Sequence, residues 1–84
     1  MLRVLFFGRI REQLDCPGLE LDYDVSCGDI DRLQQTLAET HGGRWPDVLA
    51  QENLIRAVNQ EVAADNLPLK DGDEVAFFPP VTGG

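Results

Sequence analysis

Residues 19–37 read LELDYDVSCGDIDRLQQTL, and two different periodicities meet within this stretch. From 19 to 25, apolar and acidic side chains alternate, which is typical of a strand with one buried face. Ser26 then suits a helix N-cap, and Asp29 can return the capping bond and favours the positive end of a helix. Three apolar residues follow at helical spacing: Ile30, Leu33 and Leu37. The stretch therefore predicts a half-buried strand and an amphipathic helix that ends at Gly42-Gly43.

The flanking sequence adds strands on both sides of this unit. Four further segments have the composition of strands: residues 2–7, 54–59, 62–63 and 74–78. Three connections are expected between them: a helical turn within 8–16, a short helix over 45–50 and a tight turn at 71–72. This order of elements predicts an α+β domain in which one sheet is covered on one face by the helix.

The length of the chain, 84 residues, suits one domain with a single small core. We expect the domain to occupy residues 1–78 and a flexible tail to follow over 79–84. No apolar run approaches the ~20 residues that a membrane-spanning helix needs, and residues 1–8 fit a first strand better than a signal peptide. The expected core consists of Leu2, Val4, Phe6, Leu21, Tyr23, Ile30, Leu33, Leu37, Val75 and Phe77.

Strand alternation leaves one face of the sheet without a cover of its own. If Phe77 faces the helix, its neighbours Ala76 and Phe78 face away. By the same rule Leu5 and Phe7 also face away. Val62 is expected beside them. Clustered aromatic side chains on an open sheet face predict a partner-binding site. The alternative is that the segment 8–18 folds over them.

The charge balance limits the kind of partner. Seven Lys and Arg against fifteen Asp and Glu give a net charge of −8. Such a surface repels nucleic-acid phosphates and anionic membranes, so we expect neither as a partner. It attracts a protein with a basic surface, and the attraction weakens as salt rises. An acidic balance also keeps a small protein soluble, so charge alone leaves both interpretations open.

The cysteines and the histidine do not form a recognisable chemical site. Cys16 and Cys27 lie outside Cys-x-x-Cys spacing, and with a lone His41 they cannot assemble a four-ligand zinc or iron–sulfur centre. Cys27 is near the expected helix start, where the helix dipole can stabilise a thiolate. Its alternative role is that of a small apolar residue in a reducing cytoplasm, which is where we expect the protein. His41 suits the end of the helix.

The last residues are the most suggestive of chemistry. Two glycines, Gly83 and Gly84, leave the terminal carboxylate unhindered, so that it can enter a narrow passage in another protein. The rigid Pro79-Pro80 pair projects this tail, which can reach about 20 Å. Adenylation by ATP would turn a carboxylate oxygen into a leaving group, after which sulfur, an amine or a thiol could attack. The alternative is an inert terminus.

Two segments closely resemble the small-subunit family of molybdopterin synthase. They are residues 58–61, VNQE, and residues 69–84, LKDGDEVAFFPPVTGG. The start of the chain, VLFFG at 4–8 with Arg11 and Glu12, is similar to the same family. The resemblance covers essentially the whole chain, is most specific in the last sixteen residues and is loosest between Cys16 and Asn53. It implies a ubiquitin-like β-grasp fold, a mixed sheet of about five strands in which the first and last strands are parallel.

The family resemblance also implies a mechanism. An activating enzyme adenylates the carboxylate of Gly84 with ATP, and a sulfur donor protein converts it to a thiocarboxylate. The tail, with Val81, Thr82 and Gly83, then enters the large synthase subunit, which supplies the catalytic side chains. There it passes sulfur to cyclic pyranopterin monophosphate, and two transfers build the dithiolene of molybdopterin.

The resemblance carries partner and cofactor expectations as well. Three residues correspond to the apolar contact with the large subunit, in an expected heterotetramer: Phe7, Val62 and Phe78. The chain itself is expected to bind no cofactor and no metal, and to act as a non-catalytic sulfur donor. Cys16 and Cys27 match nothing functional in the family.

Three other functions remain open at this point. A sulfur carrier of the thiamine pathway has the same fold and tail chemistry, although such chains are usually shorter. A ubiquitin-like modifier would be joined to lysines through Gly84. A binding module with an inert tail would use only the apolar face. The stretch 77–82, FFPPVT, favours the molybdopterin assignment.

Overall fold

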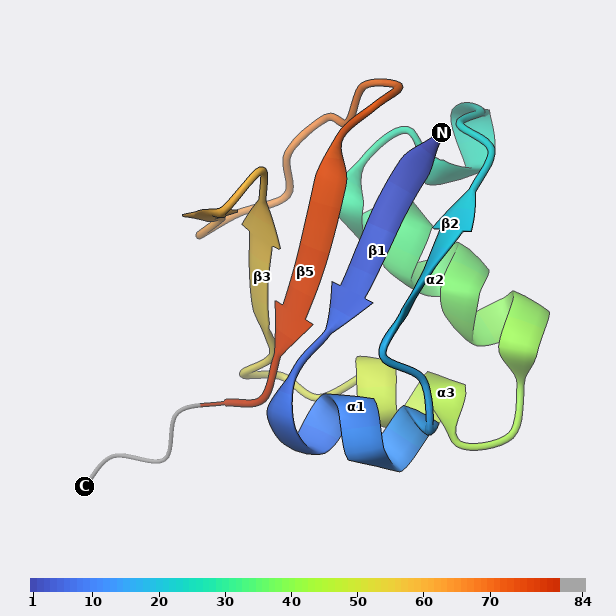
Figure 1. Ribbon diagram of the computed structural model, residues 1–84, viewed down its shortest axis with the longest axis vertical. Coiled ribbons are helices and arrows are strands. Elements are labelled where there is room, and N and C mark those ends of the chain that lie inside the picture. Colours follow the sequence, from blue (N-terminus) through green and yellow to red (C-terminus); the bar gives the residue numbers. More distant parts are fainter. Residues whose placement is uncertain (81–84) are drawn as a thin grey trace.

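The first and last strands of the domain lie side by side. In the computed structural model, which describes residues 1–80, β1 (Leu2–Phe6) pairs in parallel with β5 (Glu74–Phe78). The register places Val4 beside Val75 and Phe6 beside Phe77. Both strands occupy the middle of the sheet, as Figure 1 shows. The predicted tail residues Val81, Thr82, Gly83 and Gly84 lie outside the described residues, so the division at residue 78 stays a prediction.

Three shorter strands complete the sheet around this pair. They are β2 (Gly18–Leu21), β3 (Ile55–Val58) and β4 (Glu61–Val62), and the strand order is β2-β1-β5-β3-β4. All pairings other than β1–β5 are antiparallel. A parallel pair needs a crossover connection, and α2 (Ile30–His41) lies within that connection on one face of the sheet (Figure 1). This mixed sheet with one covering helix is the expected ubiquitin-like β-grasp fold.

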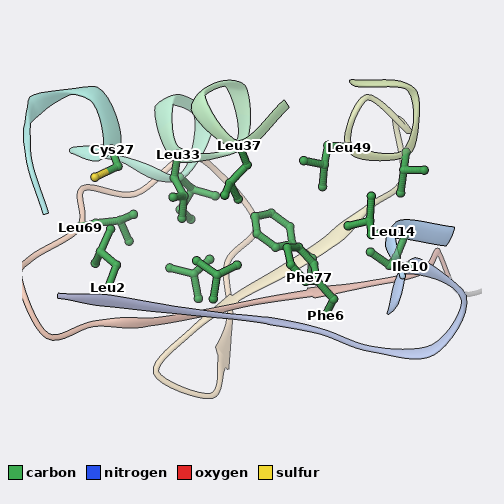
Figure 2. Close-up of a cluster of buried hydrophobic side chains, with 14 residues drawn as sticks. Leu2, Phe6, Ile10, Leu14, Cys27, Leu33, Leu37, Leu49, Leu69 and Phe77 are labelled. Atoms are coloured by element: carbon green, nitrogen blue, oxygen red, sulfur yellow. The ribbon is translucent and has the colours of Figure 1, made fainter. Parts of the chain in front are cut away.

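The core lies between the sheet and its helices, and Figure 2 shows its side chains pointing at one another from both layers. Of the predicted core, all members except Leu21 and Tyr23 are buried. Two short helices, α1 (Gly8–Leu14) and α3 (Trp45–Leu49), close one end of it. The core residues that sequence reasoning did not name are Ile10, Leu14, Cys27, Val48, Leu49 and Leu69.

The strand predicted over 19–25 is too long. β2 ends at Leu21, Tyr23 is 40% exposed and Val25 is 81% exposed. The cause is Asp24, whose carboxylate accepts the Ser26 backbone N–H at 2.7 Å and caps a short 3₁₀ helix over Val25–Cys27. A local side-chain bond thus competes with the strand ladder. Tyr23 instead donates its hydroxyl to the Leu69 carbonyl at 3.0 Å.

The start of the main helix also differs from the expectation. Asp29, not Ser26, is the N-cap of α2, and its carboxylate accepts the Arg32 backbone N–H at 2.8 Å. The helix ends at His41 with Gly42 at φ +61°, as predicted. The predicted short helix is confirmed as α3, with Pro46 in its first turn.

Candidate functional site

The sheet face opposite α2 carries a row of small and apolar residues. The register aligns Leu5 on β1 with Ala76 on β5, Ala76 with Ala57 on β3, and Ala57 with Val62 on β4. Side chains aligned in this way share one face of a sheet. Val62 is 73% exposed, whereas the two alanines are buried. We call this surface the open face.

Two aromatic rings stand at one end of the open face. Phe7, the residue that follows β1, is 39% exposed, and its ring stacks on that of Phe78 with centroids 4.7 Å apart and planes within 6°. Phe78 is half-buried and pairs across the ladder with Ile55. Stacked aromatic pairs contribute about 0.5–1.5 kcal/mol beyond their burial, so the two rings hold each other in place.

The three predicted partner-binding residues line one depression. Phe7, Val62 and Phe78 form its rim together with Leu5, while the alanines at 57 and 76 lie along the same surface. Small side chains between larger ones produce a hollow, and a hollow admits a projecting apolar side chain of a partner. Strand alternation had already placed Leu5 and Ala76 on this face, and the depression includes both. Ala57 was missed, because alanine in a strand carries no distinct signal.

The alternative in which segment 8–18 covers these rings is wrong. Residues 8–14 of that segment form α1, which packs against α3 and β5, and its apolar residues Ile10 and Leu14 are buried in the core cluster. Figure 2 shows both side chains on the core side of the sheet. The open face is therefore exposed, and its clustered apolar residues have the character of an interaction site.

The opposite end of the open face is polar. Glu20 on β2 is aligned with Arg3 on β1, and Arg3 with Glu74 on β5. Within residues 1–80 the nearest carboxylate partner of the Met1 ammonium group is Asp71, and this hydrogen bond raises the pKa of the amino group above 8.0. The open face is thus graded from charged side chains at one end to aromatic side chains at the other.

The segment that leads to the tail begins at the aromatic end. The Phe7 backbone N–H donates to the Phe77 carbonyl at 3.1 Å, which extends the β1–β5 pairing by one residue. Pro79 then lies against Gly8, the first residue of α1. The segment therefore leaves the domain beside Phe7 and Phe78, so a partner that binds the aromatic end also lies close to the start of the tail.

The cysteines and the histidine have structural surroundings. Cys27 is buried, and its sulfur accepts the Asp24 backbone N–H at 3.4 Å, which supports the role of a small apolar residue. The half-buried Cys16 donates to the Gly18 carbonyl at 3.3 Å. His41 stacks on Trp45. In the part of the chain that the structure describes, no group of three or more His, Cys, Asp or Glu side chains is placed to hold a metal ion.

The five-stranded mixed sheet with its covering helix places this chain in the class of ubiquitin-like β-grasp domains, and its open face carries an apolar depression beside the end of β5. Residues 4–84 match the ThiS family, and the chain belongs to that family. None of the helices within residues 1–80 is long and apolar enough to cross a membrane.

Relatives of the chain span its full length. It is 43% identical to the molybdopterin synthase sulfur carrier subunit of Escherichia coli K12 and 39% identical to that of Haemophilus influenzae, with all of each chain covered. Among solved structures, a complex of subunits 1 and 2 of molybdopterin-converting factor from Helicobacter pylori matches with a TM-score of 0.64 and 27% identity, over 99% of this chain and 97% of the other. Small archaeal modifier protein 1 from Haloferax volcanii shares the fold, with a TM-score of 0.72 and 24% identity over 99% and 98%.

Proposed function

We propose that this chain is the sulfur carrier subunit of a molybdopterin synthase. The observation that carries the proposal is the full-length similarity to relatives of that name, at up to 43% identity. The exposed apolar depression beside the start of the tail supports it, because a carrier needs a docking surface next to the segment that it presents to its partner.

The chemistry of the proposed function takes place at the carboxylate of Gly84. A carboxylate oxygen attacks the α-phosphorus of ATP on an activating enzyme, which forms the acyl adenylate and releases pyrophosphate. Sulfur delivered by a donor protein at the oxidation level of sulfide then attacks the acyl carbon, displaces AMP and leaves a thiocarboxylate; if the donor holds a persulfide, a second thiol releases the thiocarboxylate and forms a disulfide. The thiocarboxylate sulfur forms a carbon–sulfur bond to cyclic pyranopterin monophosphate in place of a carbon–oxygen bond of that precursor. Water then hydrolyses the resulting thioester, which leaves the sulfur on the pterin and restores the carboxylate of Gly84. Two such cycles supply the two sulfur atoms of the dithiolene.

The roles of this chain, the activating enzyme and the large subunit differ according to which reactive groups each is expected to supply. The chain supplies the acyl group and a docking surface, ATP is consumed by the activating enzyme, and the large subunit supplies the catalytic side chains. We therefore assign this chain as a non-catalytic subunit that binds no cofactor of its own. Because glycine has no side chain, the Gly83-Gly84 pair provides a narrow end of the chain that can enter a passage in the large subunit.

The partners are proposed from the surface of the domain. The large subunit binds the depression at Phe7, Val62 and Phe78, and two copies of each subunit form a heterotetramer. The net charge of −8 favours basic docking surfaces on the large subunit, the activating enzyme and the sulfur donor. A free, buried Cys27 suits a reducing cytoplasm, where we place the protein.

The decisive test is the mass of the chain after activation. Incubation with the activating enzyme, ATP and a sulfur source is expected to add one sulfur in place of one oxygen, and fragmentation is expected to locate it on Gly84. A variant that lacks both cysteines is the matched control and is expected to gain the same mass. A persulfide on Cys16 or Cys27 would contradict the proposal.

The acceptor separates the proposed function from its alternatives. With the large subunit and the pterin precursor, the thiocarboxylated chain is expected to form molybdopterin and return to its original mass. An isopeptide bond to lysines would instead establish a modifier. Transfer only in a thiazole-forming system would establish a thiamine-pathway carrier.

A further inference from the structure

Gly8 begins α1 at a point where a side chain would press against Pro79. Its φ is +55°, and a Cβ atom built on it would lie 3.0 Å from Cγ and 3.3 Å from Cδ of Pro79. Ordinary van der Waals contact begins at about 3.4 Å, so a side chain here would displace one of the two partners. Pro79 is the first residue beyond β5. The absence of a side chain at residue 8 therefore determines how closely the start of the tail approaches the domain.

Three consecutive contacts hold this point of the chain. The Phe7 N–H donates to the Phe77 carbonyl at 3.1 Å, the rings of Phe7 and Phe78 stack, and Gly8 receives the ring of Pro79. The three contacts involve Phe77, Phe78 and Pro79 in turn, so each lies one residue further along the chain than the one before. Together they continue the β1–β5 association beyond the last ladder pair, Phe6 with Phe77. We call residues 7–8 and 77–79 the bracket.

We infer that Gly8 is a positioning residue, which seats Pro79 in the bracket and thereby sets the direction in which the tail leaves the domain. The inference rests on the proposed function, since direction matters only if the tail must enter a partner. The Pro79 ring includes its own backbone nitrogen, so displacement of the ring also moves the main chain. A side chain at position 8 would therefore move the main chain at Pro79, the point from which the tail continues.

The consequence is expected in the transfer step. Reactions within a complex depend on placement of the reacting atoms, and a misplacement of about 1 Å costs on the order of a hundredfold in rate. A Cβ at residue 8 forces a shift of a few tenths of an ångström at the contact. We therefore expect Gly8→Ala to slow sulfur transfer about tenfold. Docking through the open face is expected to remain within about twofold, because Gly8 does not line the depression.

The matched control is Gly43→Ala. Gly43 has nearly the same φ, +56°, but a Cβ there would meet no atom within 4 Å. Both variants thus introduce alanine at a positive φ, and only one of them displaces Pro79. The measurements are melting temperature, calorimetric affinity for the large subunit, and single-turnover sulfur transfer by thiocarboxylated protein in the assembled synthase. The control is expected to transfer sulfur at the wild-type rate.

A double-mutant cycle tests whether the effect passes through Pro79. Pro79→Ala removes the ring, so it is expected to slow transfer by itself without changing the melting temperature, and it remains informative if Gly8→Ala does not fold. In the Pro79→Ala background, Gly8→Ala is expected to have little further effect.

Two results would overturn the inference. Transfer at the wild-type rate by Gly8→Ala or by Pro79→Ala would show that the bracket does not direct the tail. Equal slowing by Gly8→Ala and Gly43→Ala would show that backbone conformation alone is responsible. Failure of the proposed function would look different, because the wild-type chain itself would then transfer no sulfur to the pterin precursor.

Discussion

Phe77 and Phe78 are neighbours on β5 with opposite surroundings. Phe77 is fully buried beneath the helices and stacks on Phe6, whereas Phe78 lies on the open face against Phe7. A strand turns successive side chains to opposite faces, so one phenylalanine lies in the core and its identical neighbour lies on the open face. Figure 2 shows Phe77 pointing into the core.

This arrangement predicts opposite effects of the same substitution. Phe78→Arg is expected to cost the free domain about 1 kcal/mol, the value of the lost ring stack, and to weaken binding to the large subunit by about 2–4 kcal/mol. Phe77→Arg is expected to unfold the domain, because it buries an unpaired charge. Thermal melting and titration calorimetry of the two variants provide the comparison. A Phe78→Arg variant that binds normally would remove this residue from the interface.

Gly18 is predicted to be essential for stability because of a close approach of two strands. A Cβ atom at Gly18 would lie 2.6 Å from the Val4 carbonyl oxygen, a backbone atom that cannot rotate away. Gly18→Ala is therefore expected to destabilise the domain by about 2 kcal/mol, as overpacking does. Gly28→Ala is the control, because its Cβ would meet only an ordinary contact at 3.5 Å. Urea unfolding measures both, and equal stabilities would contradict the strand geometry.

The cap of α2 gives a third prediction. Asp29→Ala is expected to cost about 1 kcal/mol, because the Arg32 N–H loses its acceptor. Asp29→Asn keeps a capping oxygen and is expected to retain most of the stability. Ser26→Ala leaves this cap intact. A larger loss from Ser26→Ala than from Asp29→Ala, measured by chemical denaturation, would place the cap where the sequence pattern first suggested it.

The amino terminus predicts a pH dependence on the alkaline side. The hydrogen bond to Asp71 raises the pKa of the Met1 amino group above its usual 8.0 in the folded protein. A raised folded-state pKa stabilises the fold below pH 8.0, and this contribution is lost as pH rises through the raised value. Asp71→Asn is expected to flatten the stability profile in that window only. An unchanged profile, followed by urea melts from pH 7 to 10, would mean that the pair contributes nothing.

The acidic side of the profile has the reverse sign. Hydrogen bonds from the Ser26 hydroxyl and backbone N–H lower the pKa of Asp24 below 3.8. A lowered folded-state pKa gives stability that is present above 3.8 and is lost as pH falls through the lowered value. Asp24→Asn is expected to remove this acid dependence while it leaves the alkaline limb unchanged.

The strands and the main helix could be predicted because their apolar residues follow simple periods. The strand residues Val75 and Phe77 are two residues apart, and the helix residues Ile30 and Leu33 are three residues apart. All four side chains are buried. Leu5, Phe7 and Phe78 on the rim of the open face followed from the same alternation, whereas Val62 was assigned to the partner contact through the family resemblance. What made Phe78 recognisable was its phase relative to Phe77, which needs no knowledge of the third dimension.

The features that could not be predicted from the sequence depend on contacts between residues that are far apart in the chain. Leu69 is buried in the core cluster, and two bonds to distant residues fix its backbone there. Its N–H donates to the Gly28 carbonyl at 2.8 Å, and its own carbonyl accepts from the Tyr23 hydroxyl. Nothing in the local sequence around Leu69 indicates this. Likewise, the sequence around Gly8 is that of an ordinary turn. Only the close approach of Pro79, which is far away along the chain, shows that a side chain at residue 8 would meet another residue.

The parallel pairing of β1 with β5 has a consequence for the order of biosynthesis. The first strand emerges early, yet its central partner is made only when residues 74–78 are translated. The sheet cannot close before then, since β5 also separates β1 from β3. In a nascent chain the apolar strands β1 and β3 therefore stay without their central partner until residues 74–78 have been made. A chain that lacks residues 74–78 cannot form the central pair of the sheet, so only a chain that already includes Phe78 is expected to fold.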